Sequence, residues 1–132
     1  MIVIKNHQLN NETISALNLL IDMDINAVLA FKLMRIIKEV SSLVDDKIKL
    51  EKKIFGKYVE KDENGNPIQA IDDNNIPIKG AYKISDMDGF NKEMSELMSI
   101  ENTIVYDRVN FEDLNLTTVK IKDLAKIEFL FN

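Results

Sequence analysis

Apolar residues recur in alternating steps of four and three along one long stretch, from Asp24 to about Tyr58. The main series is Leu29, Leu33, Ile36, Val40, Leu43, Leu50 and Ile54. Lys47 occupies the one slot in this series where an apolar residue is missing. The spacing is that of one helical stripe, and the stretch contains no proline and a single glycine, Gly56. It predicts a helix roughly 50 Å long at ~1.5 Å per residue.

A helix of that length exceeds the width of a compact domain of this size, so its apolar face needs cover from end to end. A second stripe widens the face, mainly in the first half, and consists of Met34, Ile37, Val44, Ile48 and Phe55. After Leu43 the stretch becomes highly charged, with a narrow apolar seam as in a coiled coil. We favour a solvated helix packed on its own domain. The alternative is a seam between two copies, and we expect self-association through this helix.

The residues before the long helix predict a strand and a shorter helix. Met1 to Lys5 alternates as a short strand does. Asn10 or Asn11 can cap a helix from about Glu12 to Ile21. Asp24 is the expected N-cap of the long helix, so the two helices form an αα-hairpin.

Beyond Tyr58 the composition shifts toward turn residues. Lys61 to Asn66 and Asp72 to Asn75 both have turn chemistry. Two similar pieces centred on Pro-Ile, residues 66–70 and 76–80, predict two strands that turn at residues 72–75. We interpret residues 59–85 as a β-hairpin insertion in a single domain that covers residues 1–132.

The last part of the chain alternates helix and strand signals. A helix is expected from about Gly89 to Ile100, with Asp86 or Asp88 as its cap. Thr103 to Val109 alternates as a strand, a loop or extended piece runs through Leu116, and a last short helix covers Ile121 to Phe131. The predicted fold class is therefore α+β and mostly helical. A long central amphipathic helix is packed by shorter helices, with a small β-hairpin or sheet.

Composition and charge narrow the possible partners. The chain has 132 residues, of which 45% are hydrophobic and 30% charged, as is ordinary for one soluble domain. Its net charge of −5 argues against nucleic acid, whose binders are normally basic. No apolar run reaches the ~18 residues of a membrane span. The N-terminus lacks signal-peptide features, so we expect no membrane partner and a cytoplasmic location.

Residues that could carry catalysis are scarce. Without cysteine, the chain has no disulfide, thiolate metal site or cysteine nucleophile. His7 is the only histidine, and we interpret it as a surface residue of a polar turn. Asp62 to Asn66 lacks the ligand spacing of a calcium loop, and no glycine-rich phosphate loop occurs. We expect no enzyme activity, no cofactor and no metal site.

The two arginines are the first candidates for binding. Arg35 lies within the apolar half of the long helix, and Arg108 lies on the predicted strand. Arginine in such a place is usually extended to solvent or paired with a carboxylate, which is the reading we favour. The alternative is that both arginines anchor a small anionic ligand or the acidic group of a partner protein.

A basic and aromatic patch is the second candidate for binding. It comprises Lys52, Lys53, Lys57 and Tyr58, where the long helix gives way to the hairpin, with Tyr82 expected nearby. Against the acidic background of the chain, this patch suits an acidic partner surface. A solvated helix end is the simpler interpretation, and we favour it.

The order of segments resembles a family of small phage and prophage proteins of uncharacterised function. The resembling segments are IKNHQLNN, INAVLAFKLMRIIKEV, KIFGKYVEKDENGNPI, FNKEMSELMSIENTIVYDRV and IKDLAKIEFLF. They span nearly the whole chain, although the segment of residues 69–84 is longer than expected for the family. The resemblance implies a viral accessory or morphogenesis protein and supplies no site residues.

These observations lead to two hypotheses about function. The first is a phage-encoded, non-catalytic binding protein in the host cytoplasm. It inhibits or sequesters a host component, and a protein of antiviral defence is one such target. Its partner is a host protein or a small anionic ligand. The alternative is a small structural protein of the virion or of tail assembly.

Overall fold

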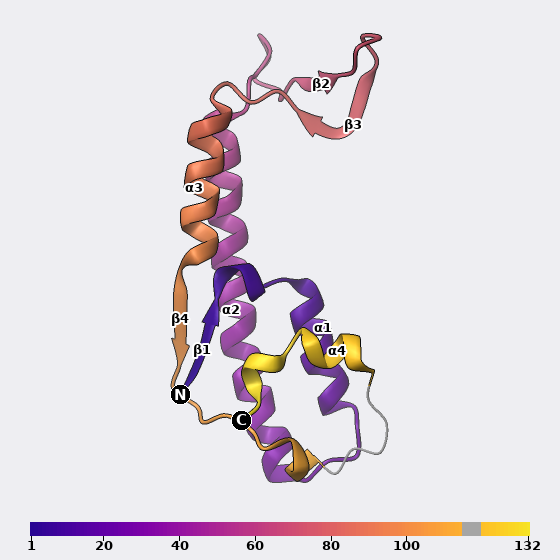
Figure 1. The fold of residues 1–132 in the computed structure, drawn as a ribbon, viewed down its shortest axis with the longest axis vertical. Coiled ribbons are helices and arrows are strands. Elements are labelled where there is room, and N and C mark those ends of the chain that lie inside the picture. The colour runs from indigo at the N-terminus through magenta and orange to yellow at the C-terminus, as the bar shows by residue number, and fades with distance from the viewer. Residues whose placement is uncertain (115–119) are drawn as a thin grey trace. The chain divides into compact units, whose positions relative to one another are not determined.

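The computed structural model describes residues 1–114 and 120–132 and shows a mostly helical α+β fold, as predicted (Figure 1). In chain order its elements are β1 (Ile2–Lys5), α1 (Asn11–Ile21), α2 (Ala27–Tyr58), β2 (Gln69–Ile71), β3 (Pro77–Tyr82), α3 (Met87–Ser99), β4 (Glu101–Ile104) and α4 (Ile121–Ala125). Short 3-10 turns cover Asn6–Gln8, Phe111–Leu114 and Glu128–Leu130. The extended piece predicted through Leu116 reaches beyond the described residues.

The chain divides into two compact units. Unit 1 comprises Met1–Ile48 and Met98–Asn132, and unit 2 comprises Lys49–Leu97. The sequence predicted one domain with an insertion at residues 59–85. The hairpin lies within unit 2, which also contains the end of α2 and most of α3.

In unit 1, β1 and β4 form an antiparallel pair in which Ile2 lies opposite Ile104. Ile2 and Ile4 are buried, whereas Val3 is exposed, so the pair covers the core with one face. The prediction of a strand over residues 103–109 was wrong, because β4 begins at Glu101 and ends at Ile104. The register explains this limit. Ile2 pairs with Ile104, so only Met1 precedes it and could pair with a residue beyond Ile104.

The core of unit 1 lies between these strands and one face of α2. It consists of Ile2, Ile4, Leu9, Ala16, Leu17, Leu20, Leu33, Ile36, Val40, Val44, Ile104, Val109, Leu114, Ile127, Phe129 and Leu130. Lys47 follows this face, and its ammonium donates a hydrogen bond of 2.6 Å to the carbonyl oxygen of Leu9. The polar residue in the apolar series therefore satisfies a backbone acceptor, which an apolar side chain would leave unpaired.

The helix caps are partly as predicted. The Asn10 side chain accepts from the backbone N–H of Thr13 at 2.9 Å and caps α1. The prediction that Asp24 caps α2 was wrong. The Asn26 side chain accepts from the N–H of Val28 at 2.9 Å, and α2 starts at Ala27.

The C-terminal helix is also shorter than predicted. α4 ends at Ala125, and a 3-10 turn follows at Glu128–Leu130. The backbone N–H of Val109 donates to the carbonyl of Leu130 at 2.8 Å, and the N–H of Asn132 donates to the carbonyl of Val109 at 3.1 Å. These bonds hold the chain end beside Val109 and replace the last turn of helix.

Unit 2 contains the predicted hairpin, in which β2 and β3 pair antiparallel. The segment after α2 joins it, because the N–H of Glu60 donates to the carbonyl of Lys83 and the carbonyl of Glu60 accepts from the N–H of Ile68. α3 runs beside the C-terminal half of α2, where the Tyr58 and Phe90 rings meet edge to face at 6.1 Å (Figure 1). In this fully described unit, only Val59 and Leu97 are buried hydrophobic residues.

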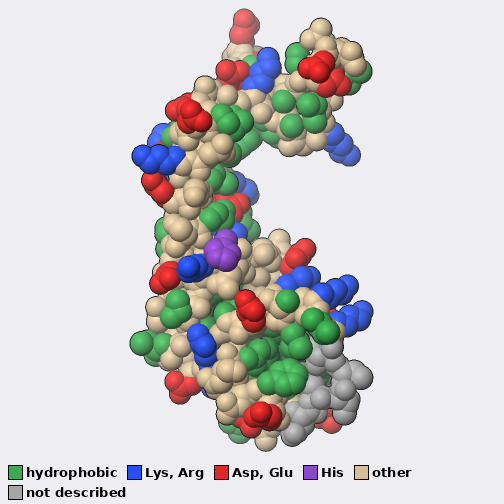
Figure 2. Space-filling view, in the orientation of Figure 1, with side chains coloured by type: hydrophobic (Ala, Val, Ile, Leu, Met, Phe, Trp, Pro, Cys, Tyr) green, Lys and Arg blue, Asp and Glu red, His purple; other side chains and the backbone are tan. Residues whose placement is uncertain are grey.

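Hydrophobic side chains are also visible on the surface of the hairpin (Figure 2). The exposed ones of β2, β3 and their turn are Ile71, Ile76, Ile78 and Tyr82. Little apolar area is thus removed from water in unit 2, and much less than in unit 1.

Candidate functional site

The solvent face of α2 in unit 1 carries apolar side chains that no core residue covers. Val28, Phe31 and Met34 are 79%, 57% and 55% exposed. The opposite face of the same helix turns Leu33 and Ile36 into the core. Large apolar side chains that are exposed together on one side of a helix mark a candidate contact surface. We name Val28, Phe31 and Met34 the apolar flank.

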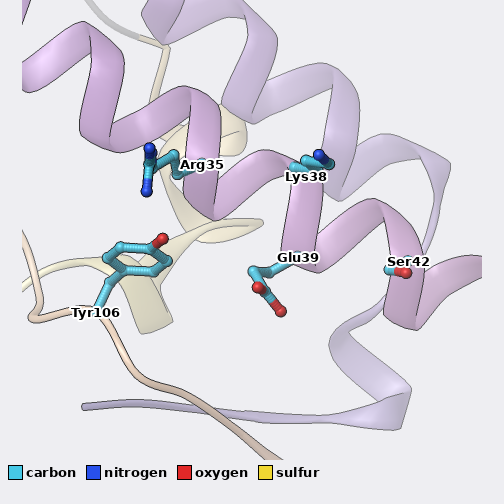
Figure 3. Close-up of a pocket in the computed structure, with 5 residues that line it drawn as sticks. All are labelled: Arg35, Lys38, Glu39, Ser42 and Tyr106. Carbon is cyan, nitrogen blue, oxygen red and sulfur yellow. The ribbon is translucent and has the colours of Figure 1, made fainter.

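An open hollow lies on the same side of α2. Arg35, Lys38, Glu39 and Ser42 of the helix line it together with Tyr106, and its volume is about 420 Å³. The Arg35 guanidinium and the Tyr106 ring face each other, and the Glu39 carboxylate is directed to the same side of the helix (Figure 3). We name this hollow the Arg35 groove.

Arg35 links the groove to the apolar flank. Its guanidinium carbon lies 4.8 Å from the centre of the Phe31 ring, which is one helical turn away. This cation–π contact holds the planar fork over the ring. The N–H groups of the fork can still bind a carboxylate in a bidentate manner.

The second arginine does not belong to this groove. Arg108 is exposed and lies beyond the end of β4, so it is not on a strand as predicted. Tyr106, from the same segment, is the residue that reaches the groove. Arg108 is not among the residues that line the Arg35 groove, so the role of the two arginines as joint anchors stays a prediction.

Sequence reasoning placed Met34 in the core and did not single out Phe31 or Lys38. A pattern that marks them is present, because Val28, Phe31, Arg35, Lys38 and Ser42 follow steps of three, four, three and four. This is one more helical stripe, about half a turn away from the buried one. Tyr106 has no such signal, because its approach to α2 is set by the tertiary fold.

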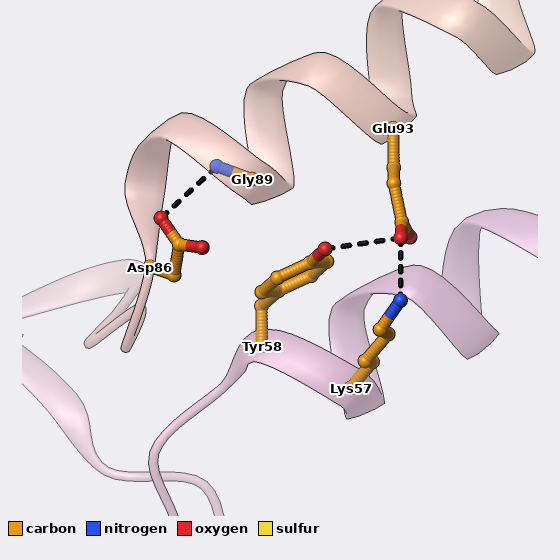
Figure 4. A network of polar contacts seen from close by, with 5 residues as sticks. All are labelled: Lys57, Tyr58, Asp86, Gly89 and Glu93. Carbon is orange, nitrogen blue, oxygen red and sulfur yellow. Dashed lines mark hydrogen bonds and ion pairs between the residues drawn. The ribbon is translucent and has the colours of Figure 1, made fainter.

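The basic and aromatic patch of unit 2 is largely used within the unit. The Lys57 ammonium and the Tyr58 hydroxyl both donate to the same carboxylate oxygen of Glu93 on α3, with the Tyr58 bond at 3.0 Å (Figure 4). The hydrogen bond from Lys57 lowers the pKa of Glu93, and that from Tyr58 adds to the effect. The hydrogen bond to Glu93 in turn raises the pKa of Lys57.

The remaining patch residues lie around this contact. The Tyr58 hydroxyl is partly desolvated, which raises its pKa, and the bond to Glu93 raises it further. The Tyr82 ring packs edge to face on Phe55 at 5.4 Å, so it lies near the end of α2 as predicted. Lys53 is exposed. Lys57 and Tyr58 thus bind Glu93 of α3, and Lys53, Lys57 and Tyr82 all stay exposed.

The start of α3 lies beside this contact of Lys57 and Tyr58 with Glu93. The Asp86 side chain accepts from the N–H of Gly89 at 3.0 Å and caps the helix, as expected for one of the two candidates (Figure 4). The Ser85 hydroxyl donates to the carbonyl of Tyr58 at 2.9 Å. These bonds fix the end of α2 to the beginning of α3.

The two acidic turns of unit 2 have the same construction. The Asp62 carboxylate accepts from the N–H groups of Asn64 and Asn66, each at 2.9 Å. The Asp72 carboxylate accepts in the same way from Asn74 and Ile76, at 2.8 and 3.0 Å. Both carboxylates therefore serve the turn itself. Within the described residues, no cluster of His, Cys, Asp or Glu side chains could hold a metal ion.

The single histidine is at the surface, as predicted (Figure 2). His7 lines a small polar hollow together with the start of α1 and residues 125, 126 and 128. Of the described helices, none is both long and apolar enough to cross a membrane.

Comparison of the chain with protein-family models, curated proteins and solved structures found no match. The resemblance to small phage proteins therefore stays a prediction from the order of segments. The argument for function consequently depends on the surface of the molecule.

Proposed function

We propose that this chain is a non-catalytic binding protein that holds a partner protein on the Arg35 groove and the apolar flank. The observation that supports the proposal is the exposure of Val28, Phe31 and Met34 beside a groove that contains Arg35 and Tyr106. Phenylalanine, methionine, arginine and tyrosine are the residue types enriched at protein interfaces. Aromatic and arginine side chains also supply most hot spots.

For the biological setting, the proposal rests on the resemblance to small phage proteins. The protein is phage-encoded and acts in the host cytoplasm, where it inhibits or sequesters a host component. Occupation of a partner's surface is sufficient for this role, because inhibition by binding needs no reaction. A groove with an exposed aromatic residue and an arginine suits such a task.

The proposal is tested with two matched apolar-to-acid substitutions. Phe31→Asp places a carboxylate in the apolar flank, whereas Ile121→Asp places one at the first position of α4, where Ile121 is 85% exposed. An acid is well tolerated at a helix N-terminus. The tagged chain, either variant or the wild type, is expressed in the host and its bound proteins are quantified by mass spectrometry.

We expect one host protein to co-purify stoichiometrically with the wild type and with Ile121→Asp, and to be lost with Phe31→Asp. Circular dichroism should be unchanged, because both side chains are exposed. A partner that both variants retain would contradict the proposed surface. A fixed copy number of the chain in purified virions would contradict the inhibitor role and support the structural alternative.

A further inference from the structure

The Arg35 groove carries one more positive than negative side chain on an acidic protein. Arg35 and Lys38 line it together with Glu39, whereas the whole chain carries a net charge of −5. Lys32 lies in a separate hollow with Glu112 and Asp113, and Asp45 and Asp46 follow the groove along α2. Arg35, Lys38 and Glu39 are exposed, and all three line the same groove. A partner that matches this potential carries negative charge.

The face also has the dimensions of a helix-binding surface. From Val28 to Ser42 it extends about 21 Å along α2, which corresponds to roughly four turns of a partner helix. The backbone N–H and C=O groups of α2 are used within the helix, so the face offers no edge for an extended strand. A helix that lies along the groove buries side chains and needs no backbone partners.

We infer that the occupant is an amphipathic helix of a partner protein with acidic side chains beside its apolar stripe. Its apolar residues cover Val28, Phe31 and Met34, and its carboxylates pair with Arg35 and Lys38. The Arg35 fork, held over the Phe31 ring at 4.8 Å, takes a carboxylate in a bidentate manner. This inference rests on the proposed function, because it specifies the partner of the same surface.

A second copy of the chain fits this face less well. A two-fold dimer brings the same patch of both copies together. In such a pair Arg35 of one copy can meet Glu39 of the other, but no second acid lines the groove to pair with Lys38 of either copy. Like charges placed together at an interface disfavour the pairing.

The inference is tested with a pair of labelled peptides of about 18 residues, each about 27 Å long as a helix. Both carry leucine at the a and d positions, and one has glutamate at the flanking positions where the other has lysine. Binding to the full chain is measured by fluorescence anisotropy. We expect the acidic peptide to bind about tenfold more tightly than the basic one, and its advantage to shrink as salt is added.

A charge reversal on the protein provides the decisive comparison. Arg35→Glu combined with Lys38→Glu should invert the preference, so that the basic peptide binds more tightly. The matched control is Lys49→Glu with Lys52→Glu, which makes the same charge change at exposed positions further along α2. The control should retain the preference for the acidic peptide.

Each other result has a defined meaning. Equal binding of both peptides, or inversion by both double variants, would overturn the acidic helix as partner. Self-association that Phe31→Asp abolishes in analytical ultracentrifugation would identify the occupant as a second copy and also overturn the inference. If Phe31→Asp still removes the host protein in these cases, the proposed function stands and only the partner class is wrong. If the peptides show no charge preference and Phe31→Asp also retains the host protein, both this inference and the proposed function are refuted.

Discussion

Gly89 is a position in unit 2 where a single added methyl group would meet close neighbours. A Cβ there would lie 2.5 Å from an Asp86 carboxylate oxygen and 3.0 Å from the Tyr58 ring. Gly89→Ala must therefore displace the cap or the ring, and we expect a loss of about 1–3 kcal/mol in the free energy of unfolding of unit 2. Urea unfolding followed by hydrogen exchange of α3 measures this loss.

Gly56 is the matched control for that substitution. It lies within α2, and an added Cβ would find nothing within 4 Å. Alanine is a better helix former than glycine, so Gly56→Ala should stabilise by about 0.5–1 kcal/mol. Effects of the same sign at both glycines would contradict the packing described for Gly89.

The contact of Glu93 with Lys57 and Tyr58 predicts that the stability of unit 2 depends on pH in the acid range through the Glu93 carboxylate. Because its folded pKa lies below the ordinary value of 4.5, the carboxylate stabilises unit 2 above that pH and loses its effect as the pH falls through the folded pKa. The raised pKa values of Lys57 and Tyr58 place the other limit at high pH, where their contribution disappears as the pH rises through them.

Glu93→Gln tests this assignment, because it keeps a hydrogen-bond acceptor and removes the charge. We expect the variant to lose part of the difference in stability between pH 7 and the acid range, as measured by amide exchange in α3. Glu63→Gln removes an exposed carboxylate elsewhere in unit 2 and is the control for the charge change itself. Identical profiles of stability against pH for the wild type and Glu93→Gln would contradict the role of the Glu93 contact.

Single residues show how far sequence reasoning reaches at this scale. The sequence marks Lys47 as an interruption of the apolar series, but its acceptor, the Leu9 carbonyl, lies 38 residues away and follows from tertiary packing. Arg35 is likewise recognisable from the sequence. Its neighbour Tyr106 is not, because β4 ends earlier than its alternating pattern predicts.

At the scale of elements, the turn at residues 72–75 offers a sharp comparison between adjacent acids. The Asp72 carboxylate accepts two backbone hydrogen bonds, whereas Asp73 is exposed. Asp72→Ala should destabilise the hairpin by about 1 kcal/mol, and Asp73→Ala should leave it nearly unchanged. Exchange rates of the β2 and β3 amides measure the difference, and equal effects would contradict the turn as described.

The elements that the sequence predicts correctly are those with local chemistry. The hairpin turns, the Asn10 cap and the helical stripe of α2 are set by residues close together in the chain. The end of β4 depends instead on how much of β1 remains to pair with it. The last helix is shortened by backbone hydrogen bonds to Val109. No residue pattern near that helix predicts these bonds.

At the scale of the whole molecule, the two units should differ in stability. Unit 1 encloses a contiguous apolar core, whereas unit 2 buries only Val59 and Leu97 among its hydrophobic residues. We expect the amides of residues 59–86 to exchange faster than those of β1, α1 and β4. Hydrogen exchange with mass spectrometry reads both units in one experiment. Uniform protection throughout would contradict the division.

The most direct test of the binding surface is site-specific photo-crosslinking in living host cells. A benzophenone amino acid replaces Phe31 in one sample and Ile121 in another, because both positions are exposed and only the first belongs to the apolar flank. We predict a crosslinked adduct with one host protein from position 31, absent from position 121 and lost when Arg35 and Lys38 are replaced by glutamate. An adduct from position 121 alone, or equal adducts from both positions, would contradict the assignment of this face as the binding site.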